Sequence, residues 1–446
     1  MPFRIGLSGL NAAQADLKVT SNNISNVSTI GFKQSRAEFA NVYATSKGGS
    51  VATAIGSGVR LAATAQQFTQ GNLIFTENNL DLAITGDGFF SMNDTSGNAV
   101  YTRNGQFKVD GDGFVVDNTG SRLQGYGVDE ATNQINTGVI TDLEIIATNI
   151  APKATETSSF VANIDSRESI PANVWGMDAN GTVDPLSYNH TTSFTSFDSL
   201  GNEMQTSLYF RKTATGDWDV GIKQVDANGN IFQNLGIAAA AGPPQILVID
   251  AATPLDNITF NNNGTLDASS TLSADGKIEF TVDLSAPTNP VMTAGGGTLI
   301  SQNIVIDLND LTQYGANFGI TNLTQNGFAT GQLSGIEIDQ SGIVLARFTN
   351  GQSSNLGQIF LTNFTNNQGL SQLGNNYWGE SLSSGQGVVN VPGQGNAGLI
   401  NSGANEDSNV DLTAQLINLI TAQRNFQANA KTISTANQVT QTLLQI

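Results

Sequence analysis

The chain has 446 residues, 37 of them acidic and 18 basic, and its net charge of −19 argues against nucleic acid and anionic lipid as partners because both would repel it. It has no cysteine and a single histidine, His190, so disulfides, thiolate chemistry and metal sites that need two imidazoles from one chain are excluded. Since only 12% of the residues are charged, we expect Asn, Gln, Ser, Thr and Gly to cover the surface.

The first predicted element is a helix over residues 3–27. Apolar residues spaced seven apart form a stripe, which is the spacing of helices that pack side by side. The stripe consists of Phe3, Leu10, Leu17 and Ile24, with Leu7 and Val27 close to it. The same segment lacks the apolar core of a signal peptide, and no run reaches the length of a membrane span, so we expect a cytoplasmic protein or one exported without a cleaved leader.

The middle of the chain is predicted to be β structure between two Gly- and Ser-rich linkers, residues 44–65 and 385–404. Residues 107–109 and 114–116 flank the turn Asp110-Gly111-Asp112-Gly113, which is a hairpin signal. Alternating or β-rich runs recur at residues 80–84, 206–210, 218–222, 277–282, 336–338, 343–345 and 358–361. No helical period alternates with them, so antiparallel sheets are favoured over a parallel α/β sheet.

The last predicted element is one long helix, because neither Gly nor Pro interrupts residues 405–446. Ser408 followed by Asp411 resembles a capping box at its start. Its apolar stripe again repeats every seven residues, at Leu412, Leu419, Phe426 and Ile433, with Leu416 and Leu444 on the same face. Since narrow stripes bury little area in an isolated helix pair, we expect copies from other chains to complete the packing.

The sequence contains only weak matches to catalytic, nucleotide-binding and metal-binding motifs. His190 has no nucleophile motif nearby and is interpreted as a surface loop residue. Residues 393–398 match G-x-G-x-x-G but lie in a predicted linker, and the turns at Asp110, Asp178 and Asp226 lack the ligands of a calcium loop. We therefore expect no cofactor, no metal and no enzymatic activity. Two acidic residues that are distant in sequence can still meet in space as the carboxylate pair of a glycosidase, but the sequence singles out no such pair.

Two end motifs resemble those of the rod–hook family of bacterial flagellar axial proteins. The N-terminal one has the form N-N-x-x-N-x-x-T-x-G-F-K and is carried by Asn23, Asn26, Thr29, Gly31, Phe32 and Lys33. The C-terminal one spans residues 408–412 and 422–430 and includes Gln423, Arg424 and Asn425. Three further stretches, residues 81–90, 102–126 and 346–376, resemble the hook branch of that family.

The resemblance implies a structural subunit of the flagellar hook, a curved flexible tube that acts as a universal joint between rod and filament. It implies a mixed, mainly β fold: antiparallel β-rich inner and outer domains, with long terminal helices that pair as a coiled-coil-like domain. The expected parts are a helical assembly domain (1–30 and 405–446), linkers (31–75 and 385–404), an inner β domain (76–153 and 327–384) and an outer β domain (154–326).

The resemblance also implies partners and a route of assembly. The subunit would polymerise with itself and meet the distal rod protein, the hook cap and the hook–filament junction proteins. It would leave the cell through the flagellar type III export apparatus without a cleaved signal peptide and lie in the extracellular hook. Phe39 and Tyr43 resemble the family's export-gate motif, and an ordinary strand or linker anchor is the alternative.

Two other functions stay open at this point. One is a distal rod-type subunit within the same family, although the large central insertion favours the hook. The other, from a different class, is a secreted β-rich carbohydrate-binding or carbohydrate-active protein with helical ends. A polymer needs paired terminal helices with apolar stripes, whereas an enzyme needs convergent reactive residues.

Overall fold

The computed structural model describes residues 2–42, 56–129, 132–145, 149–173, 183–227, 229, 231–232, 247–249, 258–267, 277–282 and 302–444. The chain divides into two compact units. The terminal unit contains Met1–Ala147, Ser334–Arg347 and Ser353–Ile446, and the central unit contains Thr148–Leu333 and Phe348–Gln352. The predicted fold class is confirmed, since the described chain is mainly β with a helix at each end.

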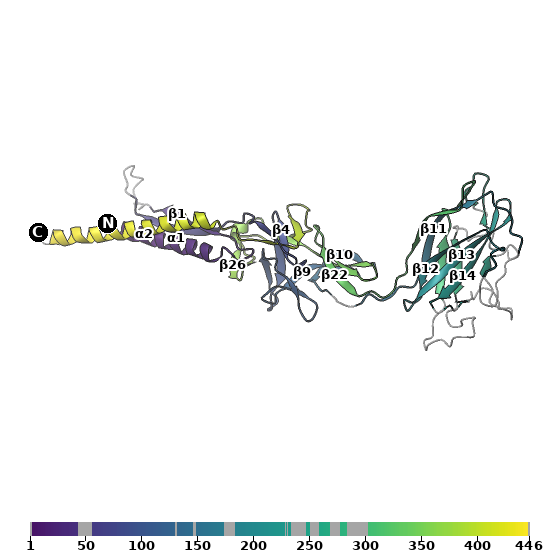
Figure 1. Ribbon diagram of the computed structural model, residues 1–446. Coiled ribbons are helices and arrows are strands. Elements are labelled where there is room, and N and C mark those ends of the chain that lie inside the picture. The colour runs from purple at the N-terminus through teal and green to yellow at the C-terminus, as the bar shows by residue number, and fades with distance from the viewer. Residues whose placement is uncertain are drawn as a thin grey trace. The chain divides into compact units, whose positions relative to one another are not determined.

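Helices α1 (Pro2–Ser25) and α2 (Leu412–Leu444) lie side by side and antiparallel in the terminal unit (Figure 1). The predicted start of α2 was wrong. Asp411 is the N-cap, because its Oδ1 accepts the backbone N–H groups of Thr413 at 2.8 Å and Ala414 at 3.1 Å. The Ser408 hydroxyl instead accepts the N–H of Val410, before the helix begins.

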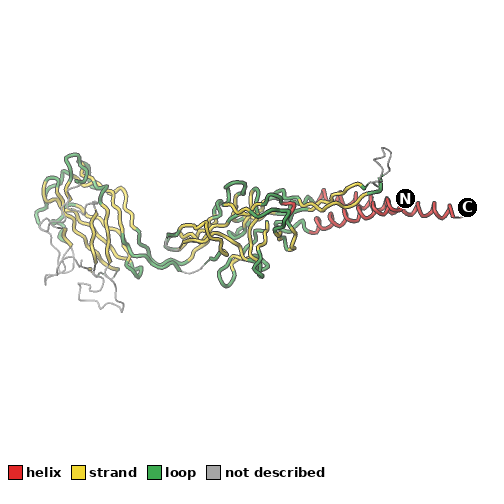
Figure 2. The backbone as a smooth tube through the Cα atoms, turned by 180° about the vertical axis from the view of Figure 1, so that it is seen from behind, coloured by secondary structure: helices red, strands yellow, loops and turns green. Residues whose placement is uncertain are grey.

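Strands β1 (Ser35–Asn41) and β2 (Val59–Gln66) form an antiparallel pair that contacts α1, and Figure 2 shows strand segments beside the helices. The sequence predicts a linker here, with a strand left open as the alternative at Phe39, so β2 was missed. The pairing of β1 and β2 is stabilised by contacts with a helix far away in sequence, such as the bond from Val59 N to Ser8 Oγ at 3.3 Å, and local composition carries no signal for such contacts.

The remaining strands of the terminal unit interleave the two halves of the chain. Strand β5 pairs with β25 and β6 pairs with β27, so segments on either side of the central unit share one sheet. The predicted hairpin at Asp110 is confirmed as β7 and β8. The bounds are β3 Leu73–Phe75, β4 Leu82–Thr85, β5 Phe89–Asn93, β6 Ala99–Thr102, β7 Lys108–Val109, β8 Val115–Val116, β9 Arg122–Asp129, β10 Gln134–Asp142, β22 Leu333–Ile338, β23 Ile343–Phe348, β24 Ser353–Ile359, β25 Leu361–Asn363, β26 Ser371–Gly374, β27 Tyr377–Gly379, β28 Val388–Asn390, β29 Leu399–Ser402 and β30 Ala404–Glu406, with a 3-10 turn at Asn367–Gly369.

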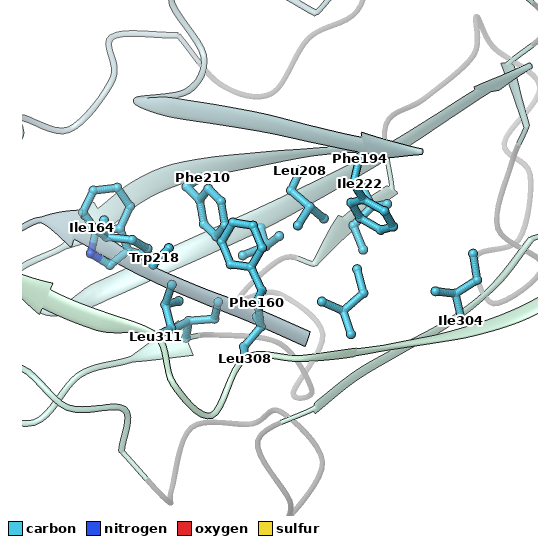
Figure 3. Close-up of a cluster of buried hydrophobic side chains, with 14 of the residues drawn as sticks. Phe160, Ile164, Phe194, Leu208, Phe210, Trp218, Ile222, Ile304, Leu308 and Leu311 are labelled. Carbon is cyan, nitrogen blue, oxygen red and sulfur yellow. The ribbon is translucent and has the colours of Figure 1, made fainter. Parts of the chain in front are cut away.

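The central unit contains two sheets around a core of large apolar side chains that includes Phe160, Phe210 and Trp218 (Figure 3). One sheet contains β11 (Thr157–Asp165), β18 (Lys277–Val282), β19 (Gln302–Asp307), β20 (Thr312–Tyr314) and β21 (Gly319–Gln325). The other contains β12 (His190–Phe197), β13 (Glu203–Ala214), β14 (Asp217–Asp226), β15 (Ile231–Phe232), β16 (Leu247–Ile249) and β17 (Ile258–Thr259).

The pairing of β11 corrects one detail of the prediction. β11 is antiparallel to β21 but parallel to β19 and β20, whereas the sequence predicts antiparallel pairing throughout. Parallel neighbours require a long crossover connection. Here the whole second sheet lies between β11 and β19 in sequence, and short-range turn signals cannot indicate such a pairing.

Candidate self-assembly surface

The two terminal helices meet along a narrow seam of small and polar residues. A Cβ atom on Gly6 would lie 2.9 Å from Ile433 Cγ1, and one on Gly9 would overlap the Asn429 side chain, so the backbones approach closely. On α2 the seam residues, buried or half-buried, recur at intervals of four and three, as in a coiled coil. They are Gln415, Leu419, Ala422, Phe426, Asn429 and Ile433, facing Gly6, Gly9, Ala13, Thr20 and Asn23 of α1.

Each predicted apolar stripe divides between covered and exposed positions. Leu10, Leu17, Ile24 and Val27 are half-buried, as are Leu419, Phe426 and Ile433. Four others are exposed: Phe3 at 40%, Leu7 at 53%, Leu412 at 44% and Leu416 at 43%. Leu444 is the last residue of α2, and its side chain lies outside the described residues.

The first half of α2 carries an apolar face that its own chain leaves about half exposed. Ile417 and Ile420 are 60% and 50% exposed and lie next to Leu416 on the helix surface. Contiguous exposed apolar surface is typical of a site that another molecule covers. The single chain therefore presents an unfilled contact surface on its terminal helices.

The N-terminal motif builds the turn that follows α1. The Asn23 amide bonds the Ser35 backbone in both directions, donating to its carbonyl at 2.8 Å and accepting its N–H at 2.9 Å, which fixes the end of α1 to β1. The Thr29 hydroxyl donates to Asn26 Oδ1 at 3.2 Å. Gly31 has φ of 71°, and a Cβ there would lie 2.5 Å from Asn104 N, so only glycine fits.

Lys33 completes this junction through a buried ion cluster. Its Nζ lies 2.6 Å from Glu406 Oε1 and donates to the Thr69 carbonyl at 2.8 Å, and both charged side chains have no exposed surface. Arg103 Nη1 lies 3.3 Å from Glu406 Oε2. Burial lowers the pKa of Lys33, and the negative charge of Glu406 opposes that effect. The cluster ties β30, which leads into α2, to the segments after α1.

The remaining predicted residues are less constrained within the chain. Phe32 is half-buried beside Lys33. Gln423, Arg424 and Asn425 are exposed on α2. Phe39 lies in β1 and is 41% exposed, and Tyr43 lies outside the described residues. Sequence reasoning missed Glu406, which belongs to no motif, and Arg103, which lies in a quoted stretch without an assigned role.

The Asp-rich turns serve the backbone. Asp110 Oδ1 accepts the N–H groups of Asp112 and Phe114, both at 2.9 Å. In Asp226 the carbonyl accepts the Gly229 N–H, and Asp178 lies outside the described residues. Across the described ranges no group of three or more His, Cys, Asp or Glu side chains is placed to hold a metal ion.

The interpretation of His190 as a surface loop residue was wrong. It begins β12, and its ring stacks on Phe318 with centroids 4.6 Å apart. Burial lowers the pKa of His190, which favours the neutral imidazole that packs between aromatic rings. The histidine is thus part of the packing of the central unit.

Comparisons with known proteins agree along the whole chain. Family matches are the flagella basal body rod protein (residues 3–33), the flagellar hook protein FlgE/F/G D1 domain (83–159), the flagellar basal body protein FlaE D2 domain (163–328) and the flagellar basal body rod FlgEFG protein C-terminal (401–446). The flagellar hook protein FlgE of Escherichia coli K12 is 36% identical over 453 residues, covering all of both chains. The chain belongs to the flagellar hook protein family.

Further relatives support this assignment. The flagellar hook proteins FlgE of Salmonella typhimurium LT2 and Treponema pallidum are 34% and 30% identical, the first over all of both chains and the second over 99% of this chain and 98% of its own. The crystal structure of Helicobacter pylori flagellar hook protein FlgE2 has a TM-score of 0.50 at 12% identity, covers 74% of this chain and 99% of its own, and supports the fold. This hook-family chain is therefore a structural subunit of the flagellar hook, and the rod-type and carbohydrate alternatives are not supported.

No helix in the described part of this hook-family chain combines the length and apolarity needed to cross a membrane.

Proposed function

We propose that this subunit polymerises with itself through its terminal helices into a curved, flexible tube that acts as a universal joint between rod and filament. The observation that carries the proposal is the exposed apolar face of α2 at Leu412, Leu416, Ile417 and Ile420. Neighbouring copies would cover that face, and burial of apolar area would drive the association.

Each part of the chain would then have its own place in the tube. Residues 1–30 and 405–446 would form the inner helical layer, 76–153 and 327–384 an inner β domain, and 154–326 an outer β domain. Residues 31–75 and 385–404, predicted as linkers, contain strands β1–β3 and β28–β29 and would join these parts as folded segments. Only 12% of residues are charged, so contacts between copies would consist largely of polar, uncharged groups. Such contacts exchange at small cost, which suits a tube whose subunits change spacing during rotation.

The same proposal includes partners beyond the chain itself. The distal rod protein and the hook–filament junction proteins would meet the two ends of the tube, and the hook cap would cover its growing end. The flagellar type III export apparatus would deliver the subunit without a cleaved signal peptide, with Phe39 and Tyr43 as the docking motif. Its place would be the extracellular hook.

A truncation tests the assembly role. Removing residues 409–446 deletes α2 and leaves the β structure, so we expect a β-rich monomer that no longer forms tubes, as judged by electron microscopy of purified protein. The full chain under the same conditions is the control and should form short curved tubes. Tubes from the truncated chain would show that the helices are not the assembly elements.

A further inference from the structure

The two terminal helices carry very few charges, and only one is negative. α1 contains Arg4, Asp16 and Lys18, and α2 contains Arg424 and Lys431. In a chain of net charge −19 this is a locally basic pair of helices with a single acid. Asp16 is half-buried, and its carboxylate has no hydrogen-bond or ion-pair partner among the residues the structure describes.

Asp16 lines a polar cavity of about 200 Å³ between α1, β1 and the start of α2. Most of the wall is amide and hydroxyl groups, from Thr20, Gln34, Ser35 and Gln415 among others. Arg36 also lines the cavity, but its guanidinium pairs with Glu38 at 2.7 Å. Burial raises the pKa of Asp16, as expected of a carboxylate that lacks a cation.

Arg424 is the complementary group. It is exposed on α2 and has no ion-pair partner within the described ranges. Asn23 Nδ2 donates to Gln415 Oε1 at 3.3 Å, and counting seven residues along each antiparallel helix from that contact places Asp16 level with Ala422. Arg424 is therefore offset from Asp16 by two residues, about 3 Å along the axis.

Arg424 and the cavity nevertheless face different directions. Arg424 lies two positions from both Ala422 and Phe426 of the seam, so at about 100° per residue it points away from α1. Asp16 and Arg424 of the same chain therefore cannot form an ion pair with each other. A contact between two different faces of the same molecule is heterologous, and repeating it builds an open helical polymer.

We propose that the Asp16 cavity of one subunit receives Arg424 of a laterally adjacent subunit. This rests on the proposed self-polymerisation. Arg424 suits the cavity better than the helix lysines, Lys18 and Lys431. Its planar guanidinium binds a carboxylate through two bonds and leaves donors for the surrounding amides. Gln423 and Asn425 flank it with further amides.

A charge swap tests the pairing. Asp16→Arg and Arg424→Asp each place like charges together, and we expect each to raise the critical concentration for polymerisation, measured by sedimentation, about fivefold. The double variant Asp16→Arg/Arg424→Asp should return it to the wild-type value. Lys431→Asp, also exposed on α2, is the matched control, and adding it to Asp16→Arg should leave the critical concentration raised.

Mixing the two single variants separates contacts between subunits from contacts within one. Each variant supplies the charge that the other lacks, so a 1:1 mixture should polymerise better than either alone. Two results would show that the pairing is wrong while the proposed function stands, provided that wild type polymerises. One is a double variant that does not recover the wild-type critical concentration, and the other is a single variant whose critical concentration equals that of wild type. If wild type stays monomeric, both fail. Should a reversed variant lose its β fold by circular dichroism, Asp16→Asn and Arg424→Gln replace them, with non-additive effects expected in the double variant.

Discussion

Lys33 and Glu406 form an ion pair with no exposed surface, although they are 373 residues apart in the chain. The pair joins the segment after α1 to the strand that leads into α2. Gly31 N donates to the Glu406 carbonyl at 2.8 Å in the same place, and Gly71 N donates to its Oε1, also at 2.8 Å. Glu406 thus fixes the base of the helix pair through a buried ion pair and two backbone hydrogen bonds.

Removing Glu406 should destabilise this junction strongly. Glu406→Gln leaves Lys33 as a buried cation without a counter-charge, and we expect the free energy of unfolding to fall by about 3–5 kcal/mol, measured by urea unfolding. Lys33→Met should cost less, because Arg103 still faces Glu406. The exposed pair supplies the control: Arg36→Ala should cost less than about 1 kcal/mol. Equal effects of Glu406→Gln and Arg36→Ala would contradict this account.

Tyr377 should make the stability of the terminal unit sensitive to alkaline pH. Burial, together with the hydrogen bond to Asp117, raises the pKa of Tyr377 from 10.0 to about 12. Because the pKa of Tyr377 is higher in the folded than in the unfolded state, its contribution to the free energy of unfolding is complete below pH 10. That contribution is lost as the pH rises towards 12.

Tyr377→Phe provides the comparison. At pH 8 we expect it to be less stable than wild type by about 1 kcal/mol, since it lacks the hydroxyl that bonds Asp117. That deficit should shrink between pH 10 and 12 in urea unfolding series, because wild type is then losing the same contribution. A deficit that stays constant over this range would show that Tyr377 does not titrate as stated.

Gly9 should be essential for the close approach of the helices. A side chain there would overlap Asn429, so Gly9→Leu should push α1 and α2 apart at a cost of about 1–3 kcal/mol and reduce tube formation. Asn11→Leu, at an exposed position of the same helix, is the matched control. Helical content by circular dichroism and tube counts by electron microscopy would check both, and tubes of normal number from Gly9→Leu would refute the close seam.

Phe39 should affect export more than folding. It is 41% exposed in β1 and pairs in register with Leu61 of β2, which is also 41% exposed. Phe39→Ala should therefore lower secretion while the circular dichroism of purified protein stays unchanged. Leu61→Ala removes a comparable apolar group from the same hairpin and should secrete normally. Equal loss in both variants would indicate a structural role for the hairpin and not a docking motif.

The central sheets should be dispensable for export and axial assembly. They form their own core, and β11 and β21, which begin and end them, are antiparallel neighbours, so a deletion from Thr157 to Gln325 removes the sheets whole. We expect tubes with changed curvature or rigidity in electron micrographs. A complete loss of tubes, with secretion intact, would mean that this part of the chain is required for assembly.

Local sequence determined much of this protein. The seven-residue repeats predicted both terminal helices, the absence of Gly and Pro predicted the length of α2, and Asp-Gly turns between apolar runs predicted the hairpin of β7 and β8. These features depend on periodicity and turn chemistry among residues that are close in the chain. The motif residues Asn23, Gly31 and Lys33 could also be selected from sequence, although their contacts could not.

Tertiary structure alone decided which side of each helix is covered. The stripes place Leu412 and Leu416 on one face with Leu419 and leave open whether that face packs within the chain or between chains. In the single chain Gln415 and Ala422 are buried while Leu412 and Leu416 are exposed, and the seam continues to Asn429 and Ile433, where glycines on α1 allow the backbones to approach. It also decided that β1 and β2 form in a predicted linker, residues 31–75, that β11 has parallel neighbours, and that Glu406 lies against Lys33. Each of these depends on contacts between residues far apart in the chain, whose free energy no local pattern encodes.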